Sequence, residues 1–74
     1  MTQAEEKELN KVFDKVVEER AKAVVRYLQL LEEKGVNNNI EAQSQHALIS
    51  DSDRHLKALV ALGADAHKLP QPIN

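Results

Sequence analysis

The feature that most constrains this chain is a run of about thirty residues, 2–34, in which large apolar residues recur at helical spacing until Gly35 interrupts the pattern. Apolar residues spaced three and four apart occupy one face of an α-helix, so the run predicts a single long amphipathic helix. Such a helix must bury its apolar face against another element. The rest of the chain is long enough for one further helix that folds back on the first, so we predict an all-α helical hairpin.

Both ends of the first helix carry recognisable capping residues. Thr2 and Glu5 have the spacing of a capping box, in which the two residues satisfy each other's backbone N–H groups. Gly35 can adopt the left-handed conformation that ends a helix, and the next residue, Val36, would then pack back on the last turn as in a Schellman motif. We therefore predict that the first helix spans about residues 3–34.

Three consecutive asparagines, residues 37–39, predict a turn after Gly35, because Asn tolerates left-handed conformations and caps helices well. A connection this short makes the two helices antiparallel. The second helix should span about residues 39–62 and stop at Gly63. Its polar stretch at residues 50–53 fits either a break followed by a new cap or one uninterrupted helix, and we favour a continuous or slightly kinked helix.

The chain beyond the second helix predicts a change from helix to irregular structure. Residues 64–69 could form one more turn, and Pro70 with Pro72 prevents regular structure after it. We therefore expect a single helical domain over residues 1–69 and a flexible C-terminal tail over residues 70–74.

The composition limits the class of protein. The chain contains no cysteine, which excludes disulfides, thiolate metal sites and cysteine nucleophiles. Its first residues lack the basic start and apolar stretch of a signal peptide, and the sequence has no apolar run of membrane-spanning length, so we expect a cytoplasmic protein with no membrane association. Ten basic residues against twelve acidic ones leave a net charge of −2, which makes nonspecific binding to nucleic acid unfavourable.

The apolar face of the first helix is three heptad positions wide. This is broader than the seam of a two-stranded coiled coil and suits a bundle in which each helix contacts two neighbours. A single core is thin in a chain of 74 residues, and association often completes it. We therefore expect a homodimer in which two hairpins form an antiparallel four-helix bundle. The expected packing and interaction surface comprises Phe13, Val16, Val24, Tyr27, Leu31, Leu48, Leu56 and Leu59.

A charged residue, Arg20, interrupts this apolar face near its middle. A turn at the asparagines places Ser52 and His55 of the second helix at the same level as Arg20. We interpret these three residues as a polar layer that fixes helix register, with Asp51 available as a counter-charge, unless Arg20 only extends its stem along the apolar surface toward water. A functional alternative is that two such layers meet in a dimer and bind an anionic ligand, or that His55 makes them sensitive to pH.

The spacing of the chemically active residue types does not match a metal-binding or catalytic motif. His46, His55 and His67 lie nine and twelve residues apart, so no two of them have the i,i+4 spacing of helical zinc ligands. The only glycines, Gly35 and Gly63, lie too far apart to form a phosphate-binding loop. We therefore predict no metal, no cofactor and no catalytic residues, and a protein that is not an enzyme.

A short part of the second helix resembles two known families. Residues 52–63 resemble the recognition helix of winged-helix repressors, in which Ser, Arg, His-Leu-Lys and a terminal Gly recur, and residues 62–66 resemble the end of an ankyrin repeat. A segment that resembles two unrelated families identifies neither. The first resemblance implies an alternative function as a DNA-binding transcriptional regulator that uses Arg54, His55 and Lys57.

The function that these patterns favour is interaction rather than catalysis. We expect a small regulator, adaptor or assembly factor that acts through helix–helix contacts with a second copy or with another protein. Small accessory proteins of bacteria and phages often have this form, which is an analogy at the level of the fold.

Overall fold

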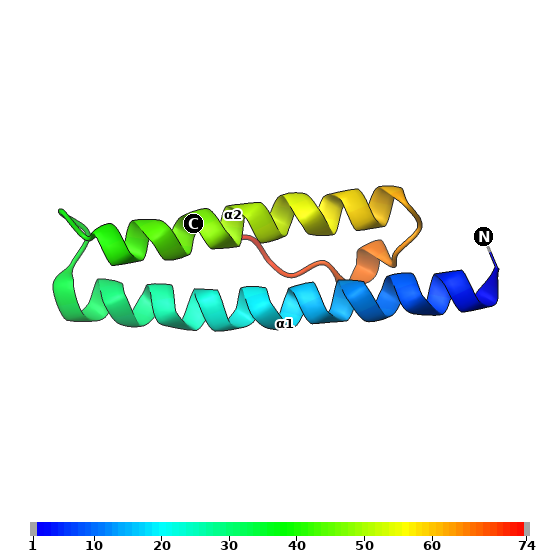
Figure 1. The fold of residues 1–74 in the computed structure, drawn as a ribbon. Coiled ribbons are helices and arrows are strands. Elements are labelled where there is room, and N and C mark those ends of the chain that lie inside the picture. The colour runs from blue at the N-terminus through cyan, green and yellow to red at the C-terminus, as the bar shows by residue number, and fades with distance from the viewer. Residues whose placement is uncertain (1, 74) are drawn as a thin grey trace.

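A computed structural model describes residues 2–73 as two long antiparallel helices followed by a short 3₁₀ turn (Figure 1). Helix α1 spans Gln3–Lys34, helix α2 spans Ile40–Ala61, and the 3₁₀ turn η1 spans Ala66–Lys68. The described part of the chain contains no strand. The molecule is a rod of 48 × 17 × 16 Å, and the prediction of an all-α helical hairpin is confirmed.

The ends of α1 are set by Thr2 and Gly35, as the sequence predicts. The Thr2 hydroxyl accepts a hydrogen bond from the Glu5 backbone N–H at 3.2 Å, and the Glu5 side chain reaches back to Thr2 to complete the capping box. Gly35 has a φ of +73°, and its N–H donates to the Leu31 carbonyl. Its ψ of −169° directs the chain outward rather than back along the helix, and Val36 is 75% exposed, so any packing of Val36 on the last turn of α1 leaves most of its surface open.

The turn between the helices depends on the side chain of Asn39, which is buried. Its Oδ1 accepts from the Ala42 N–H and caps α2, while its Nδ2 donates to the carbonyls of Leu30 and Gly35 at 2.9 Å each. One amide therefore satisfies groups at the end of α1 and at the start of α2. From this cap α2 runs without interruption through residues 50–53, so the prediction of one continuous helix is confirmed.

The core is a single line of side chains between the two helices. In α2 the buried residues Ala42, Ile49 and Leu56 recur every seven residues, and Leu59 follows three residues later, which is the spacing of packing in a coiled coil. The buried apolar residues are Phe13, Ala23, Leu30, Ala42, Ile49, Leu56, Leu59 and Ala64. Ala64 lies beyond α2 and packs with Phe13, Leu56 and Leu59, so the chain that follows α2 contributes to the core.

We refer to residues 62–73 as the C-terminal segment. It turns back after α2, forms η1, and runs along the hairpin between the two helices (Figure 1). The predicted extra turn within residues 64–69 is confirmed, whereas the flexibility predicted for residues 70–74 stays a prediction. Met1 and Asn74, which belong to the predicted domain and tail, lie outside the described residues.

Candidate interaction surface

Arg20 projects from the middle of α1, and its side chain is only 6% exposed. Its Nε donates to Asp53 Oδ1 at 2.6 Å, and its Nη2 donates to the backbone carbonyl of Gln71 at 3.2 Å. The Asp53 side chain is 38% exposed, so water reaches one side of this ion pair. Arg20 therefore connects three parts of the molecule: α1, α2 and the C-terminal segment.

The predicted polar layer forms around a different partner from the one that sequence reasoning named. Ser52 is half-buried and His55 is exposed, while the counter-charge for Arg20 is Asp53 rather than Asp51. Asp53 lies between the predicted residues Ser52 and His55 in α2, so the position of the polar layer along the hairpin agrees with the prediction. The residue was missed because the long arginine side chain reaches a position at the edge of the α1–α2 contact instead of the one that faces it directly.

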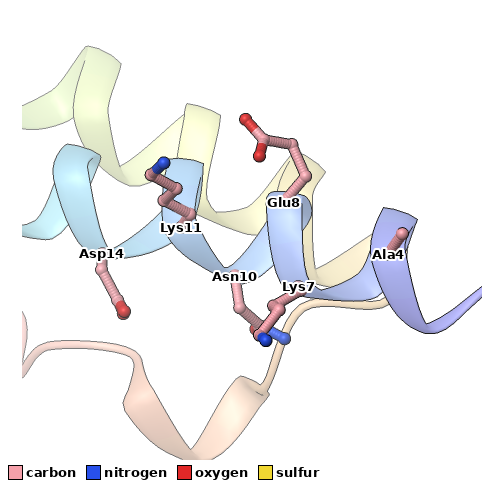
Figure 2. A pocket seen from close by; sticks show the side chains of 6 residues that line it. All are labelled: Ala4, Lys7, Glu8, Asn10, Lys11 and Asp14. Carbon is pink, nitrogen blue, oxygen red and sulfur yellow. The ribbon is translucent and has the colours of Figure 1, made fainter.

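The C-terminal segment follows α1 in the same direction, from Asn10 to Arg20. The Asp65 N–H donates to Asn10 Oδ1 at 3.4 Å, and Lys68 Nζ lies 3.8 Å from Asp14 Oδ1. The Gln71 carbonyl then accepts from Arg20, so each step along the segment advances along α1. Figure 2 shows the side chains of Asn10 and Asp14 pointing toward this segment.

A contiguous apolar surface remains at the turn end of α1, beyond the reach of the C-terminal segment. We name it the turn-end patch. Val25, Leu28 and Val36 are exposed, and Val24, Tyr27 and Leu31 are half-buried. The helical members lie three or four residues apart and are therefore neighbours on the surface. The Tyr27 ring also lies 5.5 Å from the ring of His46, and Tyr27, Leu31 and Val36 line a shallow hollow.

The residues predicted as one packing surface divide into three groups. Phe13, Leu56 and Leu59 are buried together in the core. The half-buried members are Val16, Val24, Tyr27 and Leu31. Leu48 is 53% exposed and lies away from this core cluster. The role of these residues in association stays a prediction.

The residues named for the alternative DNA-binding function lie on the outside of α2. Arg54 forms an ion pair with Asp51, and both side chains are exposed. His55 and Lys57 are exposed as well. At about 100° per residue, His55 and Lys57 point roughly 160° apart around the helix. The three side chains therefore do not converge on one face of α2.

An ion-pair cluster joins the end of α1 to the start of α2. Glu41 accepts from Lys34 Nζ at 3.0 Å, and Arg26 Nη2 lies 3.6 Å from its other oxygen. The hydrogen bond and positive charge of Lys34 lower the pKa of Glu41 below its ordinary value of 4.5, with a smaller contribution from Arg26. The Glu41 side chain is exposed, so this cluster makes only a small contribution to stability.

An open groove runs along the first turns of α1 (Figure 2). Its lining side chains all come from one helix, and they are Ala4, Lys7, Glu8, Asn10, Lys11 and Asp14. Figure 2 shows them pointing in different directions, with Glu8 and Lys11 turned away from Asn10 and Asp14. Such a groove does not present a convergent set of catalytic or ligand-binding groups.

Within residues 2–73, no three His, Asp or Glu side chains are grouped so that they could hold a metal ion. Neither of the two long helices has an apolar stretch of the length and hydropathy needed to cross a lipid bilayer.

Comparison of the chain with models of protein families, with curated proteins and with solved structures finds no match.

Proposed function

We propose that this protein is a small non-enzymatic interaction protein that associates through helix–helix contacts, and that its partner is a second copy of the same chain. The observation that carries the proposal is the turn-end patch. Isolated exposed apolar side chains are common on proteins, but a contiguous apolar surface on one helix is typical of an interaction site.

The patch continues a regular apolar line along α1. Val17, Ala21, Val24, Leu28 and Leu31 recur at alternating spacings of four and three residues, which places them on one side of the helix. Helix α2 packs against an adjacent side of α1, where Phe13, Ala23 and Leu30 are buried. Helix α1 thus has room for a second helical neighbour, which is the arrangement found in a helical bundle.

A second copy suits the patch better than a charged or polar partner. The side chains of the patch carry no charge, and about a two-fold axis the patch of one copy meets an identical apolar surface. Two hairpins joined in this way form the four-helix bundle that the width of the apolar face predicts. Because the helical part of the patch extends over only about two turns, we expect a dimer whose population depends on concentration.

Sedimentation equilibrium from micromolar to millimolar concentration tests the proposal, with two matched variants. Leu28 lies in the patch and is 54% exposed, while Leu48 is 53% exposed and lies on α2 outside the patch. We expect Leu28→Glu to weaken the dimer at least tenfold and Leu48→Glu to leave it unchanged, with circular dichroism verifying that both remain helical. The opposite result would place the interface on the Leu48 side, and a wild-type monomer at millimolar concentration would refute self-association.

A further inference from the structure

The C-terminal segment and the turn-end patch lie in succession along one side of α1. The segment contacts Asn10, Asp14 and Arg20, and the patch begins at Val24, one turn further along the helix. Val17 lies between Asp14 and Arg20 in the sequence, is half-buried, and packs against the core cluster that includes Ala64. Asn10 and Asp14 precede Val17 at the same alternating spacing, so this side of α1 is covered by the protein's own chain up to Val17 and is open from Ala21 onward.

The contacts that hold the C-terminal segment on α1 are few and mostly exposed. The ion pair between Lys68 and Asp14 is long, at 3.8 Å, and both side chains are about half exposed. The hydrogen bond from Asp65 to Asn10 is also long, at 3.4 Å. No residue of η1 is buried, and past Ala64 the segment places only Pro70 and Ile73 in half-buried positions. A segment held in this way opens more easily than the helices beneath it.

Displacement of the segment would lengthen the apolar line that is open to another helix. With the segment in place, the open part runs from Ala21, which is exposed, to Leu31, about three turns of helix. Without it, the line runs from Val17 to Leu31, which is about four turns, or roughly 21 Å at 1.5 Å per residue. Ala64 does not need to move, because it is buried in the core before the first of the segment's contacts with α1.

We propose that residues 65–73 act as an intramolecular competitor for the helix-docking side of α1, so that a second copy binds fully only when these residues are displaced. This inference rests on the proposed self-association through the turn-end patch. The segment keeps the isolated chain from presenting its full docking surface, and association exchanges the weak contacts of the segment for helix–helix contacts along Val17 to Leu31.

The test compares dimer dissociation constants of full-length variants that loosen the segment without touching the patch. Asn10→Ala with Lys68→Glu removes the hydrogen bond and places two carboxylates opposite each other at Asp14. We expect this double variant to tighten the dimer by about tenfold. Lys15→Glu, an exposed position outside these contacts, makes the same change in net charge and should not tighten the dimer. Adding Asp14→Lys restores an ion pair of opposite polarity and should return affinity toward wild type.

A second measurement follows the segment directly in the wild-type protein. The Asp65 N–H donates to Asn10 Oδ1 on α1, and its NMR resonance and hydrogen-exchange protection report whether the segment is docked. We expect this protection to fall as concentration raises the dimer population. A dimer that forms with Asp65 protection intact, or with equal affinity in the loosened variant, would overturn competition by the segment while leaving self-association standing. Absence of any dimer in the wild type and the loosened variant would instead overturn the proposed function and this inference together.

Discussion

The ion pair between Arg20 and Asp53 should respond very differently to removal of its two partners. Asp53→Ala leaves a guanidinium that is 6% exposed without the acceptor of its Nε. An orphaned charge in a fully buried pair costs about 3–5 kcal/mol, and because water reaches the Asp53 side of this pair we expect about 2–3 kcal/mol of lost stability. Arg20→Leu leaves only Asp53 and the exposed Gln71 carbonyl, both of which water can solvate, and it removes the cost of burying the guanidinium. We expect it to keep or raise the melting temperature.

Thermal unfolding followed by circular dichroism at micromolar concentration measures this asymmetry without a large contribution from association. One kcal/mol shifts the melting temperature of a domain of this size by about 4–8 °C, so Asp53→Ala should lower it by on the order of 10–20 °C. Asp53→Asn is the matched control, because it retains an acceptor for Arg20 Nε and removes only the charge, and it should give an intermediate loss. If Arg20→Leu destabilised the protein as much as Asp53→Ala, the argument from unequal burial would be refuted.

Three further predictions concern the core, the turn and the ion-pair cluster. Leu56→Ala should lower the free energy of unfolding in urea by about 2–5 kcal/mol, because the Leu56 side chain is fully buried. Leu48→Ala should change it by less than about 0.5 kcal/mol, because Leu48 is exposed. Equal losses of stability in the two variants would contradict the burial pattern. Asn39→Ala should cost about 2 kcal/mol in the same assay, because it removes the cap of α2 and two hydrogen bonds to buried or partly buried carbonyls. A loss of stability no larger than that for removing an exposed helix cap would show that the turn does not depend on Asn39. Glu41 has a lowered pKa in the folded protein, so its stabilising contribution is complete above its ordinary pKa of 4.5 and is lost as pH falls through the lowered value. The difference in melting temperature between wild type and Glu41→Gln should therefore narrow as pH falls below 4.5, and a difference that does not change with pH would exclude the Lys34 interaction as its source.

The elements that sequence reasoning predicted well are those specified by near neighbours. The capping box at Thr2 and Glu5 lies within one turn, and the end of α1 at Gly35 requires a positive φ that glycine adopts without strain. The asparagine turn is short, which leaves an antiparallel hairpin as the only compact arrangement of the two helices. Each of these inferences needs only a few consecutive residues.

The contacts of the candidate site were harder to predict because they join residues far apart in the chain. Arg20 and Asp53 are separated by 33 residues, and Arg20 and Gln71 by 51. The heptad pattern gave the correct level for a polar partner, but the choice among Ser52, Asp53 and His55 depends on small rotations of α2 about its axis. A helical wheel does not determine those rotations, because the packing of all core side chains together sets them.

The C-terminal segment shows the same limit more clearly. Its two prolines correctly predicted irregular structure, but irregular structure can lie against the protein as well as extend into water. The position of the segment on α1 follows from the burial of Ala64 and from polar contacts at Asn10, Asp14 and Arg20, none of which has a pattern in the local sequence.

The sequence by itself determined the two helices, their ends and their antiparallel order, because helix periodicity, capping and turn formation are governed by interactions within a few residues. Only the tertiary structure decided that Asp53 is the partner of Arg20, that the C-terminal segment lies against α1 between Asn10 and Arg20, and that the turn-end patch is left open. These features depend on which surfaces remain after the helices pack, and packing is a property of the whole chain.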